Sequence, residues 1–375
     1  MTHFFLSISA SSATILPMPK RVLLTGIDGF IGHHIAEGIM KETDWEIVGM
    51  SRIDGASTVQ RLYDMEEWSD GRKFKDRIRF IFHNLRSPVN EYVAYQVGHV
   101  DYILHLAAST HVDRSIDTPM EFVMDNVVGT CNLLDYARSL STKPLFVYFS
   151  TDEVFGPAPE GVAYKEWDRY NSGNPYSATK AGGEELALAY QNTYKLPMII
   201  THTMNVFGER QHPEKFFPKV IKSVLKGEKV TIHSNKDKTK AGSRFYIHAR
   251  NVAEAMLFLL KNYKDGDKYN IVGEKEVDNL TLAQSIAKVI GMPLKYEMVD
   301  FHSSRPGHDL RYALDGSKLR EMGFEYPKTF EQSLEKTINW YLDHPEWLLD
   351  REVEKIVKEL KAKKGTEKKL VGTQV

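Results

Sequence analysis

Two side chains that can act together in proton transfer lie four residues apart in the stretch Asn-Pro-Tyr-Ser-Ala-Thr-Lys, as Tyr176 and Lys180. Pro175–Tyr194 has the pattern of a helix, and residues i and i+4 share one helix face. An ammonium beside a phenol lowers the tyrosine pKa from about 10 towards neutrality, which would make it a usable base. Because Tyr-x-x-x-Lys also occurs by chance, its meaning depends on where the fold places it.

Two adjacent carboxylates follow an apolar run, in the order Thr151, Asp152 and Glu153 after residues 145–150. In doubly wound sheets, ligands bind at the carboxyl ends of the strands. Two carboxyl groups in different environments can serve as a separate acid and base. A solvated acidic turn is the ordinary interpretation of Asp-Glu, but the position of this pair, before the tyrosine, favours catalysis.

Three glycines, Gly26, Gly29 and Gly32, form Gly-x-x-Gly-x-x-Gly directly after the apolar run Arg21–Thr25. A stretch with helical spacing, residues 30–41, follows at once. Glycines let the backbone approach a pyrophosphate, and a helix N-terminus offers N–H donors and a partial positive charge. The motif predicts a dinucleotide site, and a plain strand-to-helix turn is the alternative.

The end of the next apolar run, residues 46–50, bears on which nicotinamide cofactor is used. NAD enzymes often place a carboxylate there to accept from the ribose 2′-hydroxyl, but this chain has Ser51 and Arg52. A guanidinium suits a 2′-phosphate. We therefore expect NAD(P), with NADP favoured over NAD. Alternatively, Arg52 stacks on adenine and Asp54 reaches the ribose.

Strand and helix patterns alternate through the first half of the chain, which implies βαβ units and a parallel sheet. We expect a Rossmann-type, doubly wound α/β fold with a smaller, mixed α/β C-terminal substrate domain. Strands are expected at residues 21–25, 46–50, 79–83, 102–106, 145–150 and 198–203, with helices between most of them, including 119–139 and 175–194.

The pattern changes after about residue 205, where short helices at 213–226, 251–261, 282–290 and 329–342 lie among brief strands. We expect a disordered extension at 1–19, a dinucleotide-binding domain at 20–205 and a sugar-nucleotide-binding region at 206–345. Residues 346–375 should form a charged helix, over 347–364, and a frayed tail.

Composition narrows the class of protein. Of 375 residues, 42% are hydrophobic, and 49 Lys and Arg nearly balance 50 Asp and Glu. The chain has no basic surplus that would indicate nucleic-acid binding. It also has no run of 18 apolar residues that would indicate a membrane span. The single cysteine, Cys131, excludes a disulfide framework. We expect a soluble, cytoplasmic protein.

Several stretches together resemble the extended short-chain dehydrogenase/reductases, and among these the dTDP-glucose 4,6-dehydratases. They are the three glycines, His-Leu-Ala-Ala-Ser-Thr-His-Val-Asp-Arg-Ser-Ile, Asn-Val-Val-Gly-Thr, Ser-Thr-Asp-Glu-Val-Phe-Gly, Asn-Pro-Tyr-Ser-Ala-Thr-Lys, His-Pro-Glu-Lys-Phe-Phe-Pro and Arg-Pro-Gly-His-Asp-Leu-Arg-Tyr-Ala-Leu-Asp. They occur in the family's order from about residue 20 to 345. Thr-Asp-Glu discriminates, since related epimerases and decarboxylases generally lack the Asp-Glu pair and GDP-mannose dehydratases tend to carry Thr-Ser-Glu.

The resemblance implies a lyase (hydro-lyase) that converts dTDP- or UDP-glucose to its 4-keto-6-deoxy derivative. Tyr176 takes the C4 hydroxyl proton, positioned by Lys180 and Thr151, while hydride passes to the nicotinamide. Glu153 removes the C5 hydrogen and Asp152 protonates the departing C6 hydroxyl. The cofactor then returns its hydride to C6.

The same resemblance implies the binding residues, with no metal and with a homodimer formed through helices 119–139 and 175–194. The expected cofactor-binding residues are Gly26, Gly29, Phe30, Ile31, Gly32, Ser51, Arg52, Asn84, Leu85, Leu106, Ala107, Ala108, Tyr176 and Lys180. The expected substrate-binding residues are Ser109, His111, Asn205, Glu214, Lys215, Arg244, Asn279, Arg305 and His308.

Three departures from the family pattern stand out. The acidic residue after the second strand is missing, Asn84 replaces an Asp that brackets adenine, and Arg244 lies two residues closer to Tyr246 than in the family. Residues 233–243 read as a solvated loop or a basic lid. The base, thymine or uracil, stays open. Two other functions remain as alternatives: a nucleotide-sugar 4-epimerase or decarboxylase, and a non-catalytic NAD(P)-binding regulator.

Overall fold

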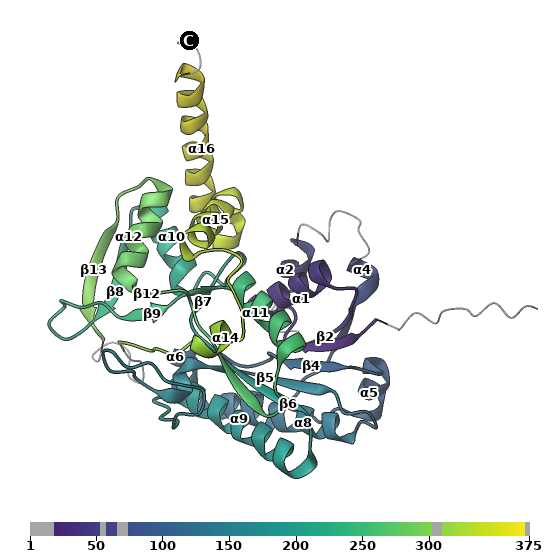
Figure 1. The fold of residues 1–375 in the computed structure, drawn as a ribbon. Helices are drawn as coiled ribbons and strands as arrows, with labels where there is room; N and C mark the ends of the chain where they lie inside the picture. Colours follow the sequence, from purple (N-terminus) through teal and green to yellow (C-terminus); the bar gives the residue numbers. More distant parts are fainter. Residues whose placement is uncertain (1–18, 53–57, 66–73, 302–309, 372–375) are drawn as a thin grey trace, which may run out of the picture.

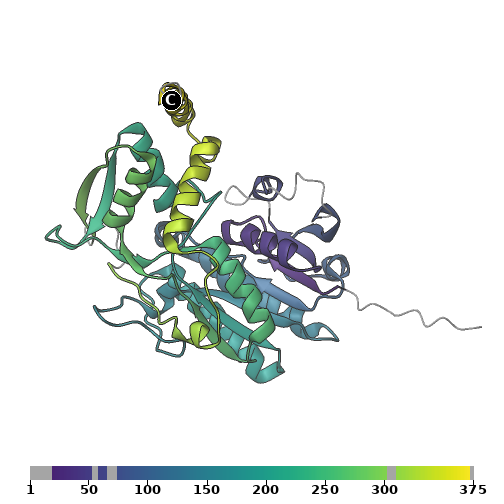
Figure 2. The same ribbon diagram turned by 45° about the horizontal axis from the view of Figure 1, so that its top comes forward.

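Short apolar runs separated by helical stretches assemble into one parallel sheet. The computed structural model describes residues 19–52, 58–65, 74–301 and 310–371 (Figures 1 and 2). The seven strands lie in the order β11-β6-β5-β4-β1-β2-β3, and every pairing is parallel. Their bounds are β1 Arg21–Thr25, β2 Glu46–Ser51, β3 Ile78–Phe82, β4 Tyr102–His105, β5 Leu145–Thr151, β6 Met198–Thr203 and β11 Asp267–Ile271. The predicted α/β fold and its strands are confirmed.

The two faces of the sheet bury alternate residues of each strand, since successive side chains point to opposite faces. Val22 and Leu24 pack with α1 (Phe30–Glu42) and α11 (Ala249–Asn262), whereas Leu23 packs with α8 (Gly129–Ser139) and α9 (Pro175–Tyr194). In Figure 1, α8 and α9 therefore lie below the sheet and α1 and α11 above it. Short helices complete this half: α2 Gln60–Tyr63, α4 Phe74–Arg77, α5 Glu91–Val97 and α6 Val112–Asp117.

The order of the strands reverses at β1. From β1 the chain builds outward to β2 and β3 and then crosses back to β4 on the other side. At such a switch point, the connections after the two central strands diverge and leave room for a ligand at their carboxyl ends. The turn after β1 and the loop after β4 therefore flank the predicted site.

The expected single helix at 119–139 is three consecutive segments. They are α7 (Pro119–Phe122), a π-helical segment η1 (Val123–Val128) and α8. A π-helical turn contains one residue more than the corresponding turn of an α-helix. Such turns often occur at functional sites.

Most of the chain beyond residue 205 forms a second layer of short helices and two-stranded sheets, at the upper left in Figure 1. The strand pairs are β7 (Val206–Phe207) with β10 (Ile247–His248), β9 (Ser243–Phe245) with β12 (Glu276–Asp278), and β8 (Lys229–Ser234) with β13 (Lys295–Asp300). The helices are α10 Phe216–Lys226, α12 Asn279–Ile290, α14 Ser317–Glu321 and α15 Phe330–Asp343. Strand β11 and helix α11 also come from this part of the chain, so the large sheet takes in residues beyond 205.

Several expected helix bounds differ from those observed. The helix expected at 213–226 begins at Phe216, whereas those expected at 251–261 and 282–290 begin earlier, at Ala249 and Asn279. The charged C-terminal helix α16 (Arg351–Val371) begins after a 3₁₀ turn, η3 (Pro345–Leu348), and Leu349 has a φ of 51° between them. A left-handed residue interrupts helical hydrogen bonding, so residues 347–350 do not join α16. The helix also continues past residue 364, the expected end.

None of the helices in the described part of the chain is both long and apolar enough to cross a membrane.

A glycine substitution tests how closely β1, its turn and α1 pack. A Cβ on Gly32 would lie 2.0 Å from the carbonyl oxygen of Gly26, so we expect Gly32→Ala to lower the free energy of unfolding by about 1–3 kcal/mol. Gly182→Ala in α9 is the control, because its Cβ would meet Val127 at an ordinary 3.5 Å and alanine favours a helix by about 0.5–1 kcal/mol. Urea unfolding measures both. Equal stability of Gly32→Ala and the wild type would contradict the packing described.

Candidate active site

The turn between β1 and α1 leaves its backbone open to a close-fitting ligand. Gly26 has a φ of +71°, and its Cβ would lie 3.0 Å from the nitrogen of Ala107 in the loop after β4. Gly29 is the N-cap residue of α1, and it makes no side-chain hydrogen bond to the first N–H groups of the helix. N–H groups without such a bond, together with the helix dipole, attract an anion. The arrangement fits the pyrophosphate of a dinucleotide.

The loop after β4 is tied to this turn by Thr25. The Thr25 hydroxyl accepts from the backbone N–H groups of Leu106, at 3.2 Å, and Ala107, at 3.1 Å. It also lies 2.9 Å from the buried ring of His105. Two of the expected cofactor residues are thereby held beside Gly26.

The carboxylates Asp152 and Glu153 begin a 3₁₀ turn, η2 (Asp152–Phe155), at the end of β5. The Thr151 hydroxyl donates to Asp152 Oδ1 at 3.0 Å and accepts from the Glu153 N–H at 3.4 Å. Asp152 is 5% exposed, and its Oδ2 has no hydrogen-bond partner among the described residues. Asp152 therefore presents a buried carboxyl oxygen, to which no described residue hydrogen-bonds, at the carboxyl edge of the sheet.

Asn174, which the sequence did not single out for the site, connects the two segments that carry the expected catalytic residues. Its Oδ1 caps α9 by accepting from the N–H of Ser177, and its Nδ2 donates to Glu153 Oε2 at 2.9 Å. One amide thus sets both the start of the helix that carries Tyr176 and the orientation of Glu153. Asn before Pro is a helix-start signal, but the contact with Glu153 depends on the tertiary fold.

Tyr176 and Lys180 lie on the inward face of α9, with 8% and 4% of their surfaces exposed. The Tyr176 N–H donates to the hydroxyl of Ser115, in α6, at 3.1 Å. Burial and then the charge of Glu153 raise the pKa of Tyr176, and a hydrogen bond with Thr151 partly opposes this. The expected lowering of the tyrosine pKa is therefore not what the protein alone produces.

The charges of Lys180 and Asp152 are also disfavoured by burial. Burial lowers the pKa of Lys180 to about 7, and its ammonium lies 4.4 Å from the ring centroid of Tyr148. Burial and then the charge of Glu153 raise the pKa of Asp152 to about 7, with Arg244 opposing them. Asp152 can therefore hold a proton near neutral pH, which is what a general acid requires.

The π-helical segment aims Asp125 and Asn126 at the loop after β4. Asn126 accepts from the Ser109 N–H and donates to its carbonyl oxygen, at 2.8 and 3.0 Å. Asp125 accepts from the Ser109 hydroxyl at 2.6 Å. Ser109, an expected substrate residue, is thus fixed by Asp125, which the sequence did not indicate, and by Asn126, the first residue of the Asn-Val-Val-Gly-Thr stretch.

A second group of expected substrate residues comes together from α6 and the segment before α10. Glu214 lies 3.8 Å from the ring of His111 and 3.2 Å from the guanidinium of Arg114. Lys215 is the N-cap of α10. Burial and then Lys215 lower the pKa of His111, so His111, Glu214 and Lys215 occupy one neighbourhood.

The remaining expected substrate residues are more dispersed. Arg244 packs over the ring of Tyr312 at 4.5 Å and is close enough to Asp152 to affect its pKa. Asn279 accepts from the Tyr246 hydroxyl at 2.6 Å. The side chain of Asn205 is exposed. Arg305 and His308 lie outside the described residues.

The carboxyl ends of β2 and β3 carry the expected adenosine-side residues. Ser51 donates to Asp28 Oδ2 at 2.5 Å, and Arg52 pairs with Asp125 at 2.7 Å. Leu85 is buried and Asn84 is exposed. Asp54, the alternative ribose ligand, lies outside the described residues.

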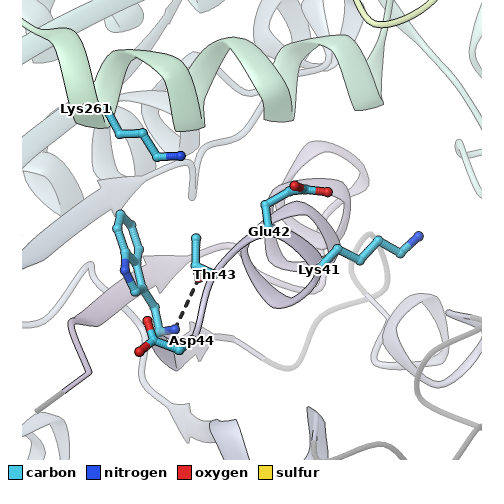
Figure 3. A pocket seen from close by; sticks show the side chains of 6 residues that line it. Lys41, Glu42, Thr43, Asp44 and Lys261 are labelled. Atoms are coloured by element: carbon cyan, nitrogen blue, oxygen red, sulfur yellow. Dashed lines mark hydrogen bonds between the residues drawn. The ribbon is translucent and has the colours of Figure 1, made fainter. Parts of the chain in front are cut away.

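A hollow of about 520 Å³ lies elsewhere, between the C-terminal ends of α1 and α11 (Figure 3). It is lined by Lys41, Glu42, Thr43, Asp44, Trp45 and Lys261. Because β2 begins at Glu46, the hollow lies at the amino end of that strand, away from the edge that carries the turn and the carboxylates.

A family model described as the NAD dependent epimerase/dehydratase family matches residues 22–272. The chain belongs to this family. It is 32% identical, over 88% of its own length and 94% of the other chain, to a dTDP-glucose 4,6-dehydratase from Salmonella typhimurium. It is also 35% identical over 88% of its length to an Arabidopsis thaliana trifunctional UDP-glucose 4,6-dehydratase/epimerase/reductase, of which it spans 48%.

Solved structures of this family share the fold. A dTDP-glucose 4,6-dehydratase from Streptomyces venezuelae, solved with NAD, superposes with a TM-score of 0.77 at 30% identity, over 87% of this chain and 98% of that one. A UDP-glucose 4-epimerase from Thermus thermophilus, solved with NAD, gives 0.76 at 25% identity, over 86% and 98%. Both activities therefore occur on this scaffold.

Membership of an NAD-dependent family does not support the expected preference for NADP. That preference relied on Arg52, but its guanidinium is ion-paired with Asp125, which also binds Arg86 at 2.5 Å. The residues of the β1–α1 turn fit a dinucleotide, and their neighbours do not single out a 2′-phosphate.

The raised pKa of Asp152 predicts a pH-dependent stability difference in protein stripped of bound nucleotide. Between pH 3.8 and about 7 the folded protein keeps a proton that the unfolded chain has released, so the wild-type free energy of unfolding falls as pH rises through this window. Asp152→Asn avoids this loss. Its stability relative to wild type should therefore grow from pH 4 to 7 and then stay level.

Chemical denaturation at several pH values measures this difference. Asp343→Asn, which removes an exposed carboxylate at the end of α15, is the control and should show a nearly flat difference. A flat difference for Asp152→Asn as well would mean that Asp152 is ionised in the folded protein.

Proposed function

We propose that the chain dehydrates a nucleoside-diphosphate glucose, dTDP- or UDP-glucose, to its 4-keto-6-deoxy derivative. The observation that carries the proposal is the pair of adjacent carboxyl groups in different environments. Asp152 is buried with a pKa near 7, while Glu153 accepts a hydrogen bond from Asn174. An acid and a base side by side at the carboxyl edge are what elimination of water across C5 and C6 needs.

The β1–α1 turn would hold NAD, with Gly26, Gly29 and the uncapped start of α1 at the pyrophosphate. The chemistry that NAD would supply when bound is to accept a hydride from C4 and to return it to C6. The loop at Leu106 and Ala107 would lie against the nucleotide, because Thr25 ties it to the turn.

Tyr176 would accept the proton of the C4 hydroxyl. Its raised pKa makes the phenolate a strong base once formed, and the ammonium of Lys180, one helical turn away, would stabilise that charge. Thr151 contacts both Tyr176 and Asp152, so its hydroxyl connects the oxidation and elimination steps.

The two carboxyl groups would then divide the elimination. A ketone at C4 acidifies the C5 hydrogen, and Glu153, oriented by Asn174, would remove it as a proton. Asp152 would give its proton to the C6 hydroxyl, which leaves as water. The proton held by Glu153 returns to C5 when C6 receives the hydride. Passage of the proton from Tyr176 to Asp152 would restore both groups, so the sugar loses one water overall.

We further propose that His111, Glu214, Lys215, Arg244 and Asn279 contact the sugar nucleotide. The first three are neighbours of one another, and Arg244 is close enough to Asp152 to affect its pKa. The homodimer stays a prediction, with residues 119–139 (α7, η1 and α8) and α9 as the pairing segments.

Epimerisation at C4 is the second candidate, because an epimerase shares the scaffold. It requires Tyr176 and Lys180 but no group that protonates a leaving C6 hydroxyl. The buried, protonatable Asp152 therefore favours dehydration.

Removing the base should stop the first step. We expect Tyr176→Phe to lower kcat on dTDP- or UDP-glucose by about 10²–10⁴-fold with the fold retained, as measured by the ultraviolet absorbance of the 4-keto product in alkali. Tyr194→Phe, on the same helix but 39% exposed, should keep wild-type turnover. Near-native turnover by Tyr176→Phe would overturn the role given to this residue.

Changing each carboxyl group should block a different half of the elimination. Glu153→Gln should slow exchange of the C5 hydrogen with deuterated solvent, and Asp152→Asn should slow loss of water while exchange continues. Mass spectrometry of the sugar nucleotide after reaction in D₂O distinguishes the two. If Asp152→Asn blocked C5 exchange and Glu153→Gln did not, the assignments of acid and base would have to be reversed.

A further inference from the structure

Asp28, in the β1–α1 turn, has a buried carboxylate that no step of the proposed reaction uses. It is 4% exposed, and its Oδ2 accepts from the Ser51 hydroxyl at 2.5 Å. Its Oδ1 has no hydrogen-bond partner among the described residues. A buried carboxylate oxygen without a donor is costly, so a missing ligand is the natural source of that donor.

This carboxylate lies beside the end of β2, where dinucleotide-binding sheets place the adenosine ribose. Ser51 is the last residue of β2, which is paired directly with β1. In dinucleotide-binding sheets the ribose 2′-hydroxyl lies at this strand end and donates to a carboxylate there. The chain has a serine at the strand end, but Ser51 is hydrogen-bonded to a carboxylate supplied by the preceding turn.

The arginines nearby are engaged with protein groups. Arg61 donates to the main-chain oxygen of Asp28 at 2.8 Å, and Arg52 and Arg86 both pair with Asp125. Two guanidiniums on one carboxylate leave a net positive charge that attracts phosphate. That charge is centred on Asp125, whereas the Asp28 carboxylate adjoins the end of β2 itself. We therefore expect the repulsion between the Asp28 carboxylate and a 2′-phosphate to outweigh the attraction by the two arginines.

We propose that Asp28 accepts a hydrogen bond from the adenosine 2′-hydroxyl and thereby selects NAD over NADP. The proposal rests on the proposed function only in requiring that the turn binds a nicotinamide dinucleotide. Ser51 orients the carboxylate by holding Oδ2, which leaves Oδ1 for the ribose. The carboxylate missing from the end of β2 is thus replaced from a neighbouring position in the fold.

Direct binding of the two nucleotides tests the assignment without any turnover. Isothermal titration of nucleotide-stripped protein gives the Kd for NAD and for NADP, and mass spectrometry identifies the nucleotide released from untreated protein. Wild type should bind NAD more tightly and release NAD. Asp28→Asn keeps the shape but removes the charge, so the NAD preference should shrink by about 10–100-fold, the range for a lost charge-assisted hydrogen bond.

Three further variants complete the design. Asp343→Asn, at a distant exposed carboxylate, should leave both affinities unchanged. Asp28→Ser alone should lose the preference for NAD, so it answers the question if Asp28→Asn does not fold. Adding Ser51→Asp to Asp28→Ser moves the carboxylate to the strand end and should restore the preference.

The failures of the two proposals are distinguishable. Tighter binding of NADP than of NAD by wild type, or an unchanged preference in Asp28→Asn, would overturn the role of Asp28 while the dinucleotide site stood. Binding of neither nucleotide would overturn the site itself and the proposed function with it.

Discussion

The site depends on one constraint: its ionisable side chains are buried from water at the carboxyl edge of the sheet. Asp152, Tyr176 and Lys180 are each more than nine-tenths buried, and burial shifts the pKa of each towards the neutral form. The protein alone therefore keeps an acid protonated, a phenol neutral and an amine easily deprotonated. Such groups respond strongly to a charge brought by a ligand, since in a medium of low dielectric a nearby charge is poorly screened.

The sequence predicted most of the fold because its signals are local. Pro175–Tyr194 and Met198–Thr203 were predicted to the residue, since a capping residue, proline and regular apolar spacing mark their ends. The placement of Tyr176 beside Thr151 follows from the same pattern once parallel strands share an edge. The helix starts that shifted, at Phe216, Asn279 and Arg351, include one whose N-cap residue makes no side-chain hydrogen bond, at Phe216, and one that follows a left-handed residue, Leu349.

The contacts that orient the site could not be read in the same way. Asn174 reaches Glu153 across 21 residues, and Arg52 reaches Asp125 across 73. The sequence suggested a phosphate ligand because it shows an arginine at position 52 but does not show that Asp125 is its partner. Asp28 carries no local signal, because the glycine spacing allows any residue at its position and its role depends on the contact with Ser51.

The π-helical segment η1 has a consequence for how one long helix serves two layers. An α-helix advances about 100° per residue, so the extra residue in a π turn offsets the apolar stripe on either side of it. Before the turn, Phe122 packs against Tyr176, and after it, Leu133 and Leu134 pack into the core beneath the sheet. The turn thus rotates the apolar stripe, so that the residues before it face Tyr176 and the residues after it face the core on that side of the sheet.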